Sequence, residues 1–404
     1  MALSIDGCDI LKICQIVPCF PYQEHLKGAC VEDGYHVGGV ERHACRLAHE
    51  LAERGHDVTV FAASSPKNSR LSEIEGLSVR RISKDLLLYN SYLPVSLLWH
   101  FDPSKYDIIH AHTPVPAIAD MVALKNVVCR TPFILTYHND IIKGGFLGGI
   151  ISSVYNMTLG KSLVKYSDTI ITTTQSYADN SRLLKSCLSK VKVIPNGIDC
   201  DLFKPGLDTN LIRKKYSISS FDKLILFVGC LEHYKGCEYL VRALPIIAEG
   251  IEQVHLLIVG SGPQSVFLRQ IAAALHIEDK ITFAGYVEDD ELPYIYASAD
   301  VFVLPSVSCY EGFGIVQLEA LSSGKPVVTT TLPGVREVDS DGVATLHVPP
   351  GDITELSLAA MKILSDASLA QWMGQRGREL VLEQYSWPKV VDQIEKLYLE
   401  VLLQ

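Results

Sequence analysis

Short runs of aliphatic and β-branched residues alternate along the chain with segments in which apolar residues recur every three or four positions. This alternation is typical of parallel α/β units, in which strands lead into helices. The first unit is the clearest. It has a buried strand over residues 11–17, a glycine-containing loop, and a helix whose apolar face runs from Val40 to Leu51. Gly55 ends this helix, and residues 56–61 form the next strand.

The same alternation starts afresh in the second half of the chain, after a polar, irregular segment from Asp199 to Asp222. We therefore predict two doubly wound, Rossmann-like domains over residues 1–205 and 206–385, with their boundary in this segment. Ligands of such sheets bind at the carboxyl ends of the strands, so two facing sheets predict a cleft. The remaining predicted strands are 107–110, 133–136 and 169–172, followed by 224–228, 256–259, 281–283, 301–304 and 326–328.

Composition narrows the class of protein. The chain has 404 residues, too many for one ordinary core, and is 48% hydrophobic and 20% charged, which is typical of well-packed globular domains. The formal net charge of −10 disfavours nucleic acid as a partner, because proteins that bind nucleic acid carry a basic surface. Eleven scattered cysteines without a C-x-x-C pair indicate a reducing compartment. No segment has the pattern of a signal peptide or a membrane span, so we expect a cytoplasmic protein.

The sharpest candidate for chemistry is the stretch from Glu311 to Glu319, which follows a predicted strand and runs into a helix. Gly312 and Gly314 allow the backbone to approach a ligand closely, and the first N–H groups of the helix suit an anion. A carboxylate does not bind phosphate, but it accepts hydrogen bonds from the vicinal hydroxyls of a ribose or a hexose. Alternatively, Glu311 caps the helix and Glu319 is a solvated helix residue. The local pattern leaves both interpretations open.

This stretch and several others resemble a known family. Two glutamates separated by seven residues within E-G-F-G-x-x-x-x-E-A, followed by G-x-P-V-V, resemble the retaining family 4 glycosyltransferases (glycosyl transferases group 1) of GT-B fold. The resemblance extends over nearly the whole chain. The other matching motifs are G-G-V-E from Gly38, V-I-P-N-G-I-D from Val193, V-G-C-L-x-x-x-K-G from Val228, I-V-G-S-G-P from Ile258 and V-F-V-L-P-S from Val301.

The resemblance implies a fold, a reaction and a set of site residues. The implied fold is α/β of GT-B type, with two Rossmann-like domains facing across a cleft. The implied reaction moves a hexose from a UDP- or GDP-sugar to a hydroxyl of a glycan, lipid-linked or small-molecule acceptor, with retention at the anomeric carbon and without a metal cofactor. The residues implied as catalytic are His138, Lys235 and Glu311, and those implied to bind substrates are Gly38, Gly39, Asp140, Val287, Gly312, Phe313, Gly314, Ile315 and Glu319.

Lys235 lies between a strand and a helix, where it offers a compact cation to a diphosphate. Without the motif, it would be read as an ordinary surface lysine. Many relatives carry an arginine two positions after the valine of this motif, where the chain has Cys230. The second phosphate cation is therefore missing or comes from another residue, such as His233, and the sequence leaves both alternatives open.

On the N-terminal side, His138 follows a predicted strand and is expected to point into the cleft, where relatives place a histidine against the donor sugar. The alternative is a structural histidine. Asp140 is expected to contact the acceptor, or else to cap a turn or helix. His110 and His112 suggest a metal pair, but we expect them to point to opposite faces of their strand. They would then not ligate one ion together, and His112 would line the cleft at most.

Two D-x-D patterns, Asp199–Asp201 and Asp339–Asp341, match the metal-binding pattern of the other large glycosyltransferase fold. Such matches are common by chance. One falls in the interdomain segment and the other beyond the donor strands, so we predict that no metal is required.

Three further expectations complete the sequence-based picture. By resemblance, a helix from Pro388 to Leu403 packs back on the N-terminal domain. The apolar segment 141–151, with Lys161 and Lys165 after it, either meets a lipid-linked acceptor at the inner face of a membrane or is a buried helix flanked by an acceptor loop. The rival functions are a nucleotide-sugar epimerase, which would be expected to lack the paired glutamates, and an inactive nucleotide-sugar-binding relative, which the substitution at Cys230 keeps open.

Overall fold

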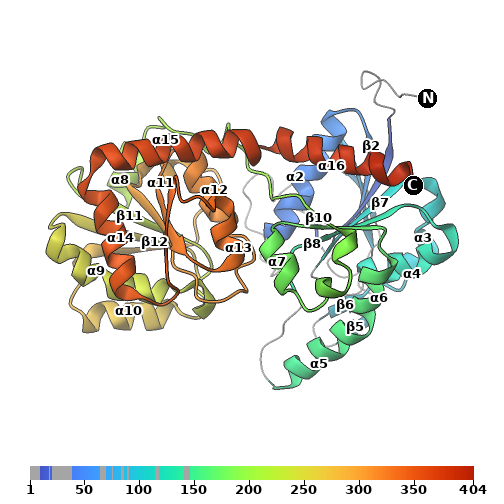
Figure 1. The fold of residues 1–404 in the computed structure, drawn as a ribbon, viewed down its shortest axis with the longest axis horizontal. Coiled ribbons are helices and arrows are strands. Elements are labelled where there is room, and N and C mark those ends of the chain that lie inside the picture. Colours follow the sequence, from blue (N-terminus) through green and yellow to red (C-terminus); the bar gives the residue numbers. More distant parts are fainter. Residues whose placement is uncertain are drawn as a thin grey trace. The chain divides into compact units, whose positions relative to one another are not determined.

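The computed structural model describes residues 10–17, 19–20, 39–63, 70–74, 76–82, 86–88, 91–113, 118–140 and 146–404. The chain folds into two compact units (Figure 1). Unit 1 comprises the chain up to Pro195 together with Val390–Gln404, and unit 2 comprises Asn196–Lys389. Each unit is built on a mainly parallel sheet, so the prediction of two Rossmann-like domains is confirmed.

The core of unit 1 is an eight-stranded sheet. Its strands are β1 (Lys12–Val17), β2 (Asp57–Ala63), β3 (Arg70–Ile74), β4 (Leu77–Ile82), β7 (Ile108–Thr113), β8 (Phe133–Tyr137), β9 (Thr169–Thr172) and β10 (Val191–Val193). Their order is β10-β9-β8-β7-β1-β2-β4-β3, and β3 is antiparallel to β4. Every residue of β7 and β8 is buried, which is typical of parallel strands enclosed by helices.

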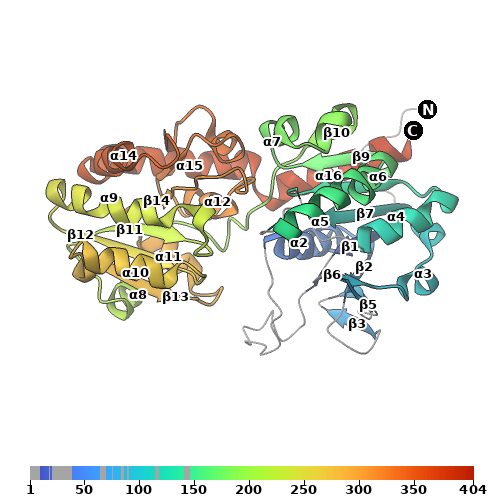
Figure 2. The ribbon, with the colours of Figure 1, turned by 90° about the horizontal axis from the view of Figure 1, so that it is seen from below.

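Helices surround this sheet (Figure 2). Helix α2 contacts β1, β2 and β7, and the hydrophobic core beneath the helices includes Phe61, Phe101 and Phe133. The helices of unit 1 are α2 (Gly39–Glu53), α3 (Leu97–His100), α4 (Ile118–Cys129), α5 (Phe146–Met157), α6 (Leu159–Tyr166) and α7 (Gln175–Asn180), together with most of α16 (Trp387–Leu402). The shorter elements are η1 (Pro103–Lys105), η2 (Leu184–Ser186), η3 (Leu188–Lys190) and a separate pair of strands, β5 (Leu86–Leu88) and β6 (Ser91–Leu93).

Unit 2 contains a fully parallel six-stranded sheet. Its strands are β11 (Lys223–Val228), β12 (Val254–Val259), β13 (Ile281–Gly285), β14 (Val301–Leu304), β15 (Val327–Thr330) and β16 (Thr345–Val348), in the order β13-β12-β11-β14-β15-β16. Its helices are α8 (Asn210–Lys215), α9 (Cys237–Gly250), α10 (Ser265–Ala274), α11 (Leu292–Ser298), α12 (Ile315–Ser322), α13 (Pro333–Arg336), α14 (Ile353–Ser365) and α15 (Ala367–Gln384), with η4 (His233–Lys235), η5 (Glu278–Lys280) and η6 (Glu337–Asp339) between them.

The strand order reverses once in each parallel sheet. In unit 1, β2 lies on one side of β1, and the chain later returns on the other side with β7. In unit 2, β12 lies on one side of β11 and β14 on the other. Doubly wound sheets bind ligands at the carboxyl ends of the strands beside such a reversal. The candidate site residues are therefore sought at these two edges.

The units divide earlier in the chain than the sequence predicts. The segment after Pro195 belongs to unit 2, because Ile198 and Phe203 are buried in the core of that unit. The chain leaves unit 2 after Lys389, within α16. The segment that enters unit 2 after Pro195 and the segment that leads out of it towards Lys389 lie side by side, since Ile198 forms a parallel bridge with Ser386. The division between the units therefore falls just before the polar segment 199–222.

The hydrophobic pattern also misses several strands, namely β3 to β6, β10 and β16. β16 lies at the edge of its sheet and is only partly buried, so it lacks the continuous apolar run of the central strands. Within the described part of the chain, no helix combines the length and the apolar character that a bilayer crossing requires.

Candidate functional site

The candidate site of unit 2 lies at the carboxyl ends of β11 and β14. Lys235 follows β11 at the end of η4, and Glu311 follows β14. The two side chains form an ion pair between Nζ and Oε2, with 12% and 9% of their surfaces exposed. Ser306 Oγ donates a 3.3 Å hydrogen bond to the same carboxylate oxygen. The fold therefore joins two predicted catalytic residues that lie 76 positions apart.

The ion pair keeps the lysine charged. Burial is the largest single influence and lowers the pKa of Lys235, but the charge and hydrogen bond of Glu311, together with Tyr234 and Cys230, outweigh it, so the net pKa lies above the ordinary value for lysine. A cation is thus fixed in a low-polarity site beside the topological reversal of the sheet.

Gly236 allows the loop after β11 to pack against the end of β14. Its φ is +68°, a left-handed conformation that disfavours residues with a side chain. A Cβ here would lie 2.0 Å from the carbonyl oxygen of Pro305. Val307 N also donates a 2.9 Å hydrogen bond to Tyr234 O. The two loops are therefore in direct backbone contact, and this contact sets the reach of the Lys235 side chain.

Helix α12 begins directly after the loop that carries Glu311. Its N-cap is Gly314, with a φ of +75°, and no side chain caps the first turn. This rules out the alternative in which Glu311 is the capping carboxylate. An N-terminus without a capping side chain suits an anion. Gly312 is partly exposed, Phe313 is buried with its ring 6.1 Å from that of Tyr385, and Ile315 is the first residue of the helix.

Glu319 lies in the second turn of α12, as the sequence predicts. It is partly exposed and accepts a 2.6 Å hydrogen bond from the hydroxyl of Tyr296, which is fully buried in α11. Burial, followed by the nearby charge of Glu319, raises the pKa of this tyrosine, so it remains a donor. Glu319 is therefore held in one orientation, unlike a freely solvated helix residue.

The loops after β11, β12 and β13 meet at the same edge of the sheet. Gly260 N donates a 2.7 Å hydrogen bond to Gly285 O, and a Cβ at Gly260 would lie 2.0 Å from Gly229 O. Val287 follows β13 with a buried side chain, while its neighbour Tyr286 is 61% exposed. This geometry presents the backbone around Val287 at the edge that also carries Lys235.

The sequence leaves open whether the second phosphate cation is missing or is supplied by His233. Cys230 is exposed and carries no positive charge. The exposed ring of His233 lies 3.5 Å from Glu238, at the start of the following helix. In the described part of the chain, His233 is thus, when protonated, a cation near Cys230 other than Lys235, and its charge partner is Glu238.

In unit 1, three histidines meet at the carboxyl ends of β7 and β8. His112 lies near the end of β7, His138 follows β8, and His43 lies in α2. His112 Nδ1 is 3.4 Å from His138 Nε2. The ring centroid of His43 is 5.9 Å from that of His112 and 5.1 Å from that of His138. The sequence predicts His138 as a site residue but misses His43, because His43 lies in α2 and belongs to no motif that includes β7 or β8.

The prediction that His110 and His112 point to opposite faces is wrong. Residues two apart on a strand share a face, and the two rings stack with their centroids 4.6 Å apart. His110 is nevertheless committed to structural contacts. Its Nδ1 lies 2.7 Å from the Tyr398 hydroxyl, and its Nε2 lies 2.6 Å from Thr136 Oγ1.

These four histidines are neutral near physiological pH. Burial lowers the pKa of His43 to about 4 and that of His110 to about 3, where the neighbouring His43 contributes as well. Burial and the adjacent imidazoles also lower the pKa values of His112 and His138 well below the ordinary histidine value.

The other predicted residues of unit 1 differ in their placement. Asp140 Oδ1 accepts 2.7 Å hydrogen bonds from the hydroxyls of Tyr137 and Ser181, which holds the chain after β8 and agrees with the alternative of a local structural role. Gly39 is exposed as the first residue of α2. Gly38 lies outside the described residues.

The two D-x-D patterns make backbone contacts. Asp199 Oδ1 accepts hydrogen bonds from the backbone N–H groups of Asp201 and Leu202. Asp339 is buried, and its carboxylate accepts a 2.7 Å hydrogen bond from Ala344 N. Both aspartates therefore shape local turns.

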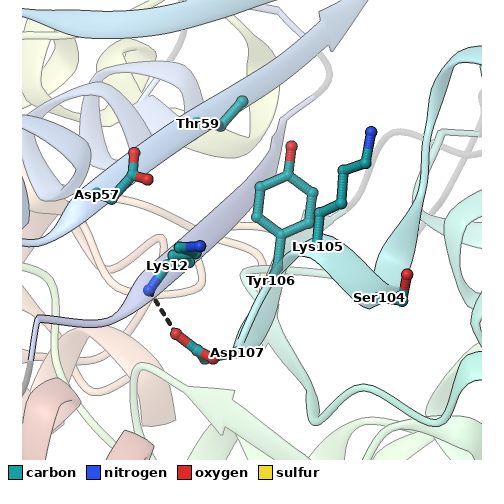
Figure 3. A pocket seen from close by; sticks show the side chains of 7 residues that line it. All are labelled: Lys12, Asp57, Thr59, Ser104, Lys105, Tyr106 and Asp107. Atoms are coloured by element: carbon teal, nitrogen blue, oxygen red, sulfur yellow. Dashed lines mark hydrogen bonds between the residues drawn. The ribbon is translucent and has the colours of Figure 1, made fainter.

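An open hollow of about 460 Å³ lies at the opposite, amino-terminal ends of β1, β2 and β7 (Figure 3). Lys12, Asp57 and Tyr106 are among the residues that line it. The Asp107 carboxylate accepts a 2.7 Å hydrogen bond from Lys12 N there, as the dashed line in Figure 3 marks. Ligands of doubly wound sheets bind at the carboxyl ends of strands, so this hollow is not the candidate site.

Comparisons with known proteins agree with the resemblance. Residues 37–202 match the family described as Glycosyltransferase Family 4, and residues 208–380 match Glycosyl transferases group 1. The chain is 31% identical over 374 residues to an uncharacterized glycosyltransferase of Methanocaldococcus jannaschii, a match that covers 90% of this chain and 94% of the relative. The chain belongs to the family 4 glycosyltransferases.

This glycosyltransferase is also 28% identical to the N-acetyl-alpha-D-glucosaminyl L-malate synthase of Bacillus anthracis, over 91% of this chain and 95% of the relative. Among solved structures, Anabaena HepE in complex with UDP-glucose is similar with a TM-score of 0.72, at 20% identity, over 96% of this chain and 99% of that one. The two Rossmann-like domains and these matches establish the GT-B fold.

Proposed function

We propose that this glycosyltransferase moves a hexose from a nucleotide diphosphate sugar to a hydroxyl acceptor, with retention at the anomeric carbon and without a required metal. The observation that carries this proposal is the buried pair of Lys235 and Glu311 beside the start of α12. The fixed cation and the helix N-terminus suit the diphosphate of such a donor, and the carboxylate suits the hydroxyls of its sugar.

The difficult step is departure of the nucleoside diphosphate while positive charge grows on the sugar ring. Lys235 and the backbone N–H groups from Gly312 to Ile315 would stabilise the leaving phosphate, each well-aimed donor contributing about 3 kcal/mol. Glu311 would hold hydroxyls of the sugar and Glu319, oriented by Tyr296, the ribose diol. The backbone near Val287 would hold the base.

In unit 1, we assign His138 to the donor sugar, with Gly38, Gly39 and Asp140 towards the β-phosphate or the acceptor. A neutral imidazole carries one donor and one acceptor, so it can exchange hydrogen bonds with a sugar hydroxyl without a proton transfer. No step of this scheme requires a carboxylate nucleophile, because the leaving phosphate itself can take the acceptor proton.

UDP-sugars are the first donors to test, since HepE is similar in fold and was solved with UDP-glucose. Small hydroxy acids are the first acceptors to test, because the Bacillus anthracis relative carries malate in its name.

Lipid-linked acceptors are a second group to test. Ile150, Val154 and Met157 form an exposed apolar stripe at helical spacing on α5, and the residues 141–145 before this helix lie outside the described residues. For this route, Val154→Glu should reduce co-sedimentation with anionic vesicles.

The decisive experiment screens UDP-, GDP- and ADP-sugars by thermal shift and then measures nucleoside diphosphate release with and without acceptor, in EDTA. We expect one base to raise the melting temperature, release to depend on acceptor, and the product to keep the donor's anomeric configuration. An isomerised sugar without release would indicate an epimerase. Stabilisation without any turnover across the acceptor panel would indicate a binding protein.

A further inference from the structure

The three-histidine group of unit 1 has the composition of a metal site. His43, His112 and His138 come from three different elements, and one ring nitrogen of each lies within 4.8 Å of the others. Among the described residues, no other group of three or more histidine, cysteine or acidic side chains has this spacing. His43 and His112 are buried, whereas His138 is partly exposed and leaves a route for an ion.

The closest distance in the group fits a shared ion better than a hydrogen bond. His112 Nδ1 and His138 Nε2 are 3.4 Å apart, longer than the range of about 2.7–3.2 Å that is usual for N–H···O hydrogen bonds in proteins. Two imidazole nitrogens bound at about 2.0–2.1 Å to one tetrahedral ion lie about 3.3 Å apart. The ligand nitrogen of His43 lies within 4.8 Å of the other two nitrogens. A rotation of its side chain can bring it to the distance that a shared ion requires.

The contacts of the neighbouring His110 differ from those of the three grouped histidines. His110 stacks on His112, yet both of its nitrogens have short contacts, to Tyr398 and Thr136. His112 Nε2, in contrast, has no hydrogen-bond partner within the described part of the chain. The ring of His112 is therefore fixed by stacking on a locked neighbour, while its nitrogens are not committed to carbonyl or carboxylate groups.

From this geometry we propose that His43, His112 and His138 bind one divalent ion of the Zn²⁺ class, which also includes Co²⁺, Ni²⁺ and Cu²⁺. Three neutral imidazoles suit these ions, whereas Mg²⁺, Ca²⁺ and Mn²⁺ prefer oxygen ligands. Three protein ligands leave a fourth position open for water or another oxygen ligand. This site shares His138 with the proposed contact to the donor sugar but goes beyond the proposed transfer reaction, which requires no metal, so its test reads the ion directly.

The test uses the full chain without a histidine tag, stripped with EDTA and titrated with Co²⁺. We expect one Co²⁺ per chain, visible d–d absorption of tetrahedral strength, and displacement by Zn²⁺ but not by Mg²⁺. His112→Asn and His138→Asn should each weaken binding at least tenfold. The matched controls His110→Asn, a stacked neighbour with committed nitrogens, and His100→Asn, on the surface, should retain the stoichiometry.

A second measurement does not depend on variants that fold. X-ray absorption of the wild-type chain with one Zn²⁺ should show three imidazole ligands and an oxygen. No saturable binding, a shell dominated by oxygen or sulfur, or undiminished binding in both His112→Asn and His138→Asn would overturn the proposal. Because turnover is assayed in EDTA, failure of the ion site and failure of the transferase assignment give separate results.

Discussion

At the scale of single residues, the pairing of Lys235 with Glu311 changes how their roles must be tested. Each side chain is the only charged partner that the other contacts within hydrogen-bonding distance in the described residues, and both are nearly buried. Removing one partner leaves an uncompensated buried charge, which typically costs about 3–5 kcal/mol of stability. A loss of activity in a single variant therefore mixes catalysis with folding.

A double-variant cycle separates the two effects. Lys235→Met and Glu311→Gln should each lower the urea midpoint, and Lys235→Met, which leaves a carboxylate unpaired, should lower it more. The double variant should be more stable than Lys235→Met alone, because no buried charge remains. All three should lose about 100-fold or more in kcat with the donor found by screening. Full turnover by the well-folded double variant would contradict the assignment of the site.

Gly236 provides a second prediction at this scale. Gly236→Ala should lower the free energy of unfolding by more than about 2 kcal/mol, because it adds both backbone strain at positive φ and a clash with Pro305 O. Gly206→Ala is the matched control. Gly206 has a φ of +83° but nothing within 4 Å of an added Cβ, so its variant carries strain alone. Equal urea midpoints for the two variants would show that the close approach contributes nothing.

At the scale of elements, α15 holds α12 in place. Close approach of their backbones depends on small residues, since a Cβ at Gly374 would lie 2.1 Å from Gly324 O. Arg378 of α15 donates 2.9 Å hydrogen bonds to the carbonyl oxygens of Ser322, at the end of α12, and of Phe203 and Cys200 in the segment that enters unit 2. One guanidinium thus joins three pieces of unit 2.

Loss of this guanidinium should be costly. Arg378→Met should lower the free energy of unfolding by about 2–4 kcal/mol, because several charge-assisted hydrogen bonds to carbonyl groups are lost. Arg376→Met on the same helix is the control. Arg376 is half-exposed and contacts Glu379, so its replacement should cost less than about 0.5 kcal/mol. Urea unfolding of both variants provides the measurement, and similar values would exclude the joining role of Arg378.

At the scale of the whole molecule, the C-terminal helix returns the chain to unit 1. Within that unit, Glu395 lies 2.9 Å from His56 Nε2 and also pairs with Arg54. Leu11 N donates to His56 Nδ1, so the ring proton lies on Nε2 and points to Glu395. Burial raises the pKa of Glu395, but its bonds to His56 and Arg54 lower it by more, so the net pKa lies below the ordinary value.

This pKa shift predicts a pH dependence of stability. A carboxyl whose pKa is lowered by folding contributes stability above its unfolded pKa of about 4.3, and that contribution is lost as pH falls through the folded value. Glu395→Gln should therefore destabilise the protein at pH 7 and have a much smaller effect near pH 3. Glu400→Gln, an exposed position on the same helix, should show no such change. A pH-independent penalty for Glu395→Gln in urea unfolding would contradict this account.

The hydrophobic pattern by itself determined most of the architecture. Runs such as Leu224–Val228 are buried on both faces in the sheet, and local periodicity is enough to place such strands and the helices between them. The motif around Glu311 and Glu319 also placed Glu311 in the loop between a strand and a helix, as β14 and α12 show. A strand, a glycine loop and a helix are continuous in sequence, so local pattern is enough for this. The polar segment after Pro195 packs Ile198 and Phe203 into the core of unit 2, which composition alone does not show.

Only the tertiary structure decided which side chains meet. Sequence spacing could not show that Lys235 and Glu311 form an ion pair, because their contact depends on β11 and β14 lying side by side. It also could not join His43 of α2 to His112 of β7 and to His138, which follows β8. The local pattern fixes which elements form and which face each residue occupies, whereas contacts between distant residues depend on strand order and on glycines that let the loops touch.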